Sequence, residues 1–83
     1  MRMIDMDSET AVKLLQLYLT PKEALNFRKE LDRLITNPEA NEHSHIYSED
    51  MFCELSFSSL TEKKLKNIKS YTKMEQKILT QKK

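Results

Sequence analysis

The stretch LLQLYLTPKEALNFRKELDRLI, Leu14 to Ile35, decides the fold, because it joins a short apolar segment to an amphipathic helix. The letters T-P-K-E at 20–23 form a capping box. In such a box the Thr20 hydroxyl accepts the Glu23 backbone N–H, and the Glu23 carboxylate accepts the backbone N–H of Thr20. Pro21 suits the first helical position, where no N–H is needed. A helix is therefore predicted to begin at Pro21.

The residues after this cap have the periodicity of an amphipathic helix that packs against another part of the protein. Apolar side chains recur at spacings of three and four: Ala24, Phe27, Leu31, Leu34 and Ile35. Such spacing places them on one face of a helix. The helix should end at Asn37-Pro38, because a residue before proline is pushed out of the α region.

The segment 11–19 before the cap allows two interpretations. Its apolar residues fit a helix behind Ser8 as cap, or a strand with both faces partly covered. We favour the strand, because a new helix starts at Thr20 and a strand leading into such a cap is a common joint. Residues 1–10 are polar and acidic enough to be a frayed arm.

Two further strands are predicted on either side of a turn at Ser48-Glu49-Asp50. Residues 43–47 and 52–58 alternate in polarity and are rich in residues that favour strands. The alternation points Ile46, Leu55 and Phe57 toward the core, together with Cys53 as a small core residue. It points a second set outward: His43, His45, Tyr47, Phe52, Glu54, Ser56 and Ser58.

The last predicted element is a helix that starts after Thr61 as cap and runs to about residue 80. Apolar residues fall on one side of its wheel: Leu65, Ile68, Tyr71, Ile78 and Leu79. Lysines fall on the other: Lys63, Lys66, Lys69, Lys73 and Lys77. This face is typical of a solvated helix and is also compatible with phosphate binding.

These elements predict an α+β fold in the order β-α-β-β-α. A right-handed crossover makes the first two strands parallel, and the hairpin allows its second strand to sit in the middle. The result is a three-stranded sheet with two helices on one face, ferredoxin-like but lacking the last strand. Within 83 residues we expect one domain at 11–80, with a frayed tail at 81–83.

The amino-acid composition limits the classes of function that this protein can have. The chain has no glycine and one cysteine, which argues against phosphate-cradling loops, nucleophile elbows, disulfides and thiolate zinc clusters. We therefore expect no enzyme activity and no cofactor. No apolar run has the length of a membrane helix or signal peptide, so we expect a cytoplasmic protein. Residues 1–59 carry six basic and eleven acidic residues, whereas 60–83 carry eight and two.

The sheet face away from the helices is the candidate partner surface. It would display Leu14, Tyr18, His43, His45, Tyr47 and Phe52, beside the acidic turn residues Glu49 and Asp50. An apolar and aromatic surface of this kind indicates a contact between proteins, either a homodimer or another partner. The alternative is a strand register off by one residue, which would turn some of these side chains into the core.

Two other constellations are weaker. His43 and His45 share one side of a strand, as a metal pair would. The only candidates for a third ligand are Glu54 and a residue of a second subunit, so no metal site is predicted. Lysines without arginine or interleaved aromatics are a weak nucleic-acid signature. The lysines that would carry that alternative function are Lys66, Lys69, Lys73 and Lys77.

The order of L-T-P-K-E-A, a helix ending N-P-E, H-S-H-I, L-S-F-S and T-E-K-K-L resembles small bacterial immunity-type domains of the immunity protein 32 group. The resemblance covers residues 12–70 and carries no position-specific binding motif. It implies an inhibitor, bacterial or phage in type, that binds and blocks a cognate toxin such as a nuclease. The sequence thus predicts a protein-binding module, with a small nucleic-acid-associated regulator as the alternative.

Overall fold

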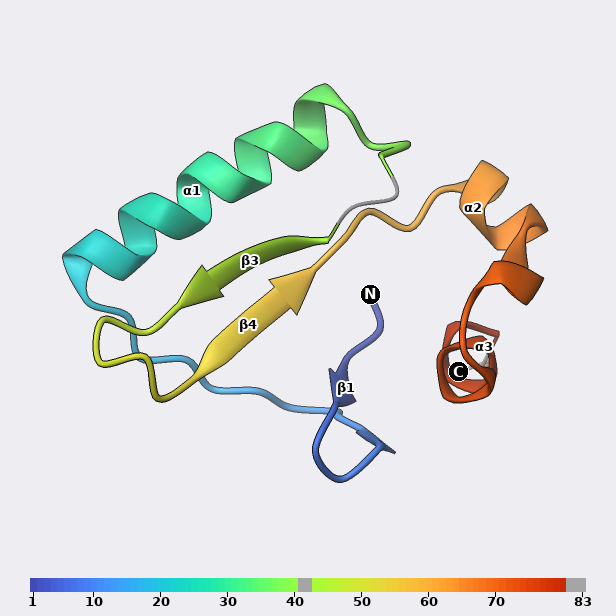
Figure 1. The fold of residues 1–83 in the computed structure, drawn as a ribbon, viewed down its shortest axis with the longest axis horizontal. Helices are drawn as coiled ribbons and strands as arrows, with labels where there is room; N and C mark the ends of the chain where they lie inside the picture. Colours follow the sequence, from blue (N-terminus) through green and yellow to red (C-terminus); the bar gives the residue numbers. More distant parts are fainter. Residues whose placement is uncertain (41–42, 81–83) are drawn as a thin grey trace. The chain divides into compact units, whose positions relative to one another are not determined.

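The computed structural model describes residues 1–40 and 43–80, which form two compact units. One unit combines Met1–Gln16 with the chain from Glu62 onward, and the other spans Leu17–Thr61. Within the described residues, each unit contains one two-stranded antiparallel sheet, and three α-helices complete an α+β structure (Figure 1). No helix of this part of the chain has the length and apolar character needed to span a membrane.

The helix α1 (Pro21–Thr36) confirms the predicted start and end. The Glu23 N–H donates to Thr20 Oγ1 at 3.1 Å, and the Thr20 N–H donates to Glu23 Oε1 at 2.8 Å. Both halves of the capping box are therefore formed. After Thr36 the backbone leaves the helix at Asn37, whose N–H still donates to the carbonyl of Arg33 at 3.0 Å.

The predicted hairpin is also confirmed, as β3 (Ser44–Tyr47) and β4 (Glu54–Phe57). The strands are antiparallel, with Ser44 opposite Phe57 and Tyr47 opposite Glu54. Ser44 and Ile46 are buried, whereas the intervening residues of β3 are exposed. The predicted faces of this strand are thus correct, and no one-residue slip has occurred.

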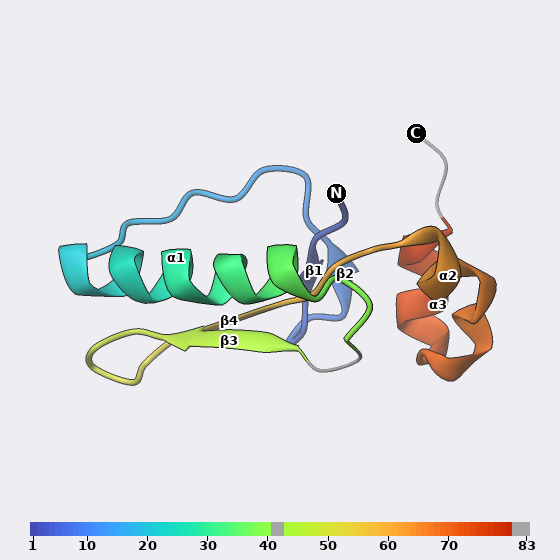
Figure 2. The same ribbon diagram turned by 90° about the horizontal axis from the view of Figure 1, so that it is seen from above.

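The core of this unit lies between α1 and one face of the hairpin. Figure 2 shows α1 in a layer of its own beside β3 and β4. Ile46 is 6% exposed, and the rings of Phe27 and Phe57 lie 5.1 Å apart between their centroids. Burying a side chain such as Ile46 contributes about 2 kcal/mol. Within the described residues of this unit, no other element packs on the opposite face of the hairpin, which we call the open face.

Of the strand predicted at 11–19, only Ala11 lies in a strand. β1 (Ile4–Asp5) and β2 (Thr10–Ala11) pair with each other, so part of the arm expected to be frayed is a short hairpin. Lys13–Thr20 has no regular secondary structure. A strand needs a hydrogen-bonding neighbour, and an apolar alternation alone does not provide one. The three-stranded ferredoxin-like sheet is consequently not seen in the described residues.

The predicted C-terminal helix is divided into α2 (Glu62–Lys66), the 3-10 turn η1 (Ile68–Ser70) and α3 (Lys73–Leu79). The division occurs because Thr72 is extended, with ψ at 161°, and caps α3. Thr72 and Glu75 form a second capping box, with N–H···O distances of 3.1 and 3.2 Å. The T-K-M-E letters at 72–75 carry this signal in the sequence, where the single-helix prediction overlooked it.

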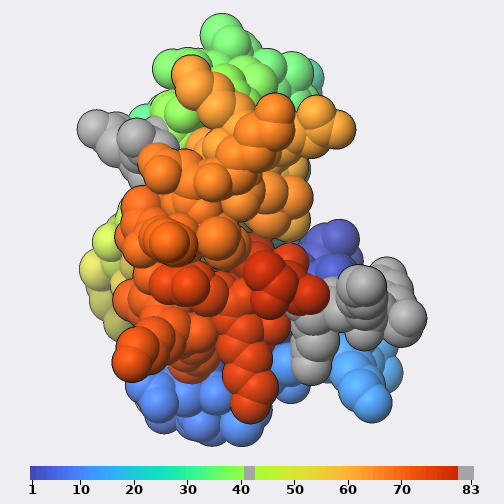
Figure 3. Space-filling model, turned by 90° about the vertical axis from the view of Figure 1, so that its right-hand side faces the viewer, coloured from blue at the N-terminus to red at the C-terminus, as the bar shows by residue number. Residues whose placement is uncertain are grey.

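The unit that contains α3 is held partly by a contact distant in sequence. Arg2 Nε donates to the carbonyl oxygen of Ile78 at 3.1 Å, and Ile78 is the buried residue of α3. Figure 3 shows the surface that α2, η1 and α3 (orange to red) form in this unit. The arginine therefore links the N-terminal hairpin to the last helix.

Candidate functional site

Three aromatic side chains form a row on the open face of the hairpin. The ring centroids of His43 and His45 lie 6.4 Å apart, and those of His45 and Tyr47 lie 6.3 Å apart with planes only 12° from parallel. Across the strands, His45 Nδ1 and Glu54 Oε2 are 2.6 Å apart. All four side chains are exposed. The row is an exposed surface of aromatic rings that also carry polar atoms.

The turn that joins β3 to β4 is built from a network around Ser48 and Asp50. The Ser48 hydroxyl donates to Asp50 Oδ1 at 2.6 Å, and the Phe52 N–H donates to the same oxygen at 3.0 Å. The Cys53 N–H donates to Ser48 Oγ at 2.9 Å. The Ser48 hydroxyl, and then the Phe52 N–H, hold the pKa of Asp50 below its ordinary value. Asp50, predicted as a contact residue, therefore shapes the turn.

The same turn holds two large apolar side chains in solvent. Met51 has a φ of 61° and is 69% exposed, and Phe52 beside it is 88% exposed. A left-handed conformation is unfavourable for a side chain such as methionine, and the surrounding structure must maintain it. Sequence reasoning identified Phe52 but missed Met51, because no glycine or asparagine marks the left-handed position.

Glu23 fixes this turn to α1. Its Oε2 accepts the Glu49 N–H at 2.8 Å, while its Oε1 belongs to the capping box with Thr20. The side chain is only 8% exposed. Hydrogen bonds from the backbone of Thr20, and next from that of Glu49, lower the pKa of its carboxyl below the ordinary 4.5. One carboxylate thus connects the start of the helix to the tip of the hairpin.

Two predicted residues lie elsewhere than expected. Tyr18 is 89% exposed, but it belongs to the irregular segment before α1, which Figure 2 shows on the helix side of the hairpin. It does not join the row formed by His43, His45 and Tyr47. Cys53 is exposed and is not the core residue that the alternation predicted. It precedes β4, and its backbone N–H belongs to the hydrogen-bond network of the turn.

The lysines predicted for nucleic-acid binding are distributed over three short segments. Lys66 ends α2, Lys69 lies in η1, and Lys73 and Lys77 lie in α3. All four are exposed, but the wheel that aligned them assumed one continuous helix. Lys64 of α2, which the wheel did not single out, is buried. Across residues 1–40 and 43–80, no three His, Cys, Asp or Glu side chains are grouped so that they could hold a metal ion.

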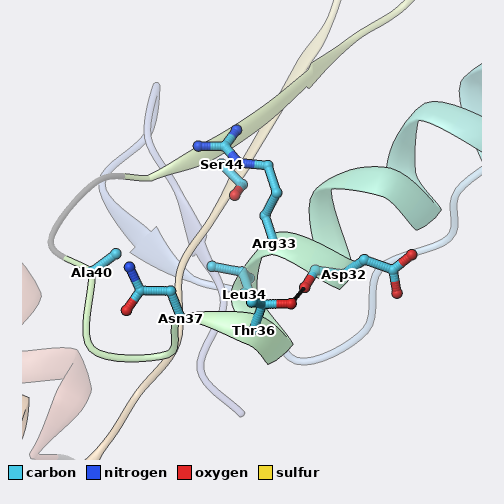
Figure 4. Close-up of a pocket in the computed structure, with 7 residues that line it drawn as sticks. All are labelled: Asp32, Arg33, Leu34, Thr36, Asn37, Ala40 and Ser44. Atoms are coloured by element: carbon cyan, nitrogen blue, oxygen red, sulfur yellow. Dashed lines mark hydrogen bonds between the residues drawn. The ribbon is translucent and has the colours of Figure 1, made fainter.

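Two shallow grooves follow α1. The first lies at the end of the helix and is lined by Asp32, Arg33, Leu34, Thr36, Asn37, Ala40 and Ser44. Figure 4 shows the Arg33 side chain extending past Ser44, and the Thr36 hydroxyl donating to the Asp32 carbonyl at 2.9 Å. The Arg33 guanidinium also pairs with Glu30 at 2.8 Å.

The second groove lies between α1 and β3. The helix contributes Lys22, Asn26, Lys29 and Glu30, and the hairpin contributes His45, Ile46, Tyr47, Ser48, Glu49 and Met51. It therefore runs from the strand to the turn that exposes Met51.

No protein-family model, curated protein or solved structure matches this chain.

Proposed function

We propose that this protein is a non-enzymatic protein-binding module whose contact surface is the exposed turn and the adjoining open face of the hairpin. The observation that carries the proposal is the display of Met51 and Phe52, which are 69% and 88% exposed. Ser48 and Asp50 accept four hydrogen bonds that maintain this turn, one of them from the Met51 N–H to the Ser48 carbonyl at 2.8 Å. The Glu49 N–H also donates to Glu23.

The physical reason is that the turn adopts an unfavourable backbone conformation, and burial of its apolar side chains does not offset this cost in free energy. A positive φ at a residue with a long side chain is unfavourable, and both apolar side chains remain in water. Because hydrogen bonds already fix the backbone of the turn, binding would cost little backbone entropy, and an exposed apolar pair of this kind suits the centre of a protein interface. The row of His45 and Tyr47 extends the surface from the turn along β3.

The charge around the turn favours a basic partner. Glu49 is exposed at the tip and Glu54 is exposed on β4, so the apolar pair is flanked by carboxylates. Complementary charge mainly accelerates association and excludes unsuitable partners. An inhibitor of a basic toxin such as a nuclease, as the resemblance to immunity-type domains implies, is the specific form that we propose. A homodimer through the same face is the second form.

We also propose that the segment before α1 completes the sheet as a third strand at the free edge of β4. Leu17 and Leu19 are each 41% exposed, and they alternate along the chain with Gln16, Tyr18 and Thr20. Pairing would cover apolar surface and provide the β-α-β-β-α order. Slow hydrogen exchange at the Leu17 and Leu19 amides would support this pairing, and exchange at unprotected rates would refute it.

The binding proposal is tested with a photo-crosslinking amino acid at position 52 in the producing cells, and at Thr36, an exposed residue outside the proposed surface, as the matched control. We expect a protein captured from position 52 alone. The purified pair should then lose at least tenfold in affinity when Phe52→Ser is introduced, while Thr36→Ser binds normally. Capture of a second copy would identify the homodimer. Equal capture from both positions, no capture, or unchanged affinity of Phe52→Ser would refute the proposal.

A further inference from the structure

The free edge of β3 is a feature distinct from the open face, because it presents backbone groups and not side chains. The Ser48 N–H donates to the Cys53 carbonyl at 2.9 Å, and antiparallel pairing alternates from there. Ile46 therefore directs its N–H and C=O toward β4, whereas His45 and Tyr47 direct theirs away from it. In the described chain, no backbone hydrogen bond outside the hairpin satisfies these outward groups.

This edge lacks the devices that usually protect a strand from further pairing. Proteins block exposed edges with lysine, proline, a bulge or a covering element. The sequence of β3 is S-H-I-Y, without lysine or proline, and its register with β4 is regular over all four pairs. The edge can therefore accept one more extended strand.

The groove between α1 and β3 determines which strand would fit. Lys22, Asn26 and Lys29 are spaced by four and three, so they share one face of α1, and all three line the groove. Of the two acidic residues in the groove, Glu30 is already paired with Arg33 at 2.8 Å. Glu49 lies at the turn end of the groove. Lys22 and Lys29 thus add positive charge to the groove, and no ion pair within the described chain joins either of them to Glu30 or Glu49.

We propose that the free edge of β3 binds an extended acidic segment of another protein by strand addition. Side chains of an added strand alternate between the two faces of the sheet. Those on the α1 side would be Asp or Glu, facing Lys22 and Lys29. Those on the open side would be apolar, beside His45 and Tyr47. A second copy that paired through its own β3, S-H-I-Y, would bring no carboxylate of that strand to Lys22 and Lys29, so the charge of the groove favours an acidic segment of another protein.

This inference does not rest on the proposed function, because it uses the strand edge and the groove instead of the turn. The probe is the capped peptide acetyl-T-E-V-E-V-E-T-amide, titrated into isotope-labelled protein and followed by amide chemical shifts. The charge control is the same peptide with lysine in place of glutamate. The Phe52→Ser variant should bind the probe as the wild type does, which separates this site from the turn.

The backbone contribution is tested with two substitutions at one position. Tyr47→Pro removes an outward N–H that β4 does not use, and proline is tolerated at such an edge position. Tyr47→Val keeps the N–H and is the matched control. We expect Tyr47→Pro to bind the peptide about fivefold more weakly than Tyr47→Val, the effect of one hydrogen bond of typical strength. If Tyr47→Pro fails to fold, a peptide N-methylated at alternate residues tests the same edge, because it loses the hydrogen bonds that its N–H groups would donate to the outward carbonyls of β3.

The charge contribution is tested with Lys22→Gln combined with Lys29→Gln. We expect about a tenfold loss of affinity and a weaker dependence on salt than in the wild type. The proposal is refuted if the peptide shows no saturable binding at millimolar concentration or if the lysine peptide binds equally well. It is also refuted if neither the proline variant nor the N-methylated peptide reduces affinity.

Discussion

Replacing Ile46 with alanine tests the packing on which the open face depends. Ile46 is 6% exposed and lies between β3 and α1. The substitution removes three carbon atoms, worth about 0.8 kcal/mol each, and the incompletely filled cavity raises the cost to about 3 kcal/mol. Tyr47, its neighbour on the opposite face, is 48% exposed, so Tyr47→Ala should cost less than about 1 kcal/mol.

The measurement is urea denaturation of both variants and the wild type, followed by far-ultraviolet circular dichroism, which reports α1. A protein of this size has a free energy of unfolding of roughly 5 kcal/mol. Ile46→Ala should therefore lose more than half of it, with the transition midpoint falling accordingly. Tyr47→Ala should unfold close to the wild type.

The comparison is decisive because the two residues are adjacent in one strand. If Tyr47→Ala destabilised the protein as much as Ile46→Ala, the assignment of the two faces would be incorrect. The row of His43, His45 and Tyr47 would then be core, and neither proposed surface would exist as described.

Two other predictions concern the start of α1. Thr20→Ala removes the side-chain half of the capping box and should lower the free energy of unfolding by about 1 kcal/mol in the same denaturation assay, whereas Thr20→Ser should be nearly neutral. Hydrogen bonds lower the pKa of Glu23 in the folded state. The contribution of this carboxylate to the free energy of unfolding is therefore complete above about pH 4.5, and it is lost as the pH falls through the lower folded-state pKa. Glu23→Gln should therefore reduce the acid dependence of stability, with Asp50 and Asp5 still contributing; an unchanged pH profile would contradict this assignment.

Local patterns predicted the elements whose signals lie within a few residues. The capping box at Thr20 predicted the start of α1, and alternation predicted both strands of the hairpin and the exposure of His45 and Tyr47. The break before α3 was also encoded, since Thr72 and Glu75 repeat the capping-box spacing. The apolar residues at helical spacing on both sides of Thr72 nevertheless predicted one continuous helix.

The sequence by itself determined where α1 begins and which face of the hairpin is buried, because caps and side-chain alternation act between near neighbours. Only the tertiary structure decided that residues 13–19 lack a strand partner and that Glu23 binds the Glu49 N–H, 26 positions away. It also decided that Met51 takes a positive φ and holds Phe52 in solvent. These features depend on hydrogen-bond partners that are distant along the chain, and no periodicity in one segment specifies which partner it will find.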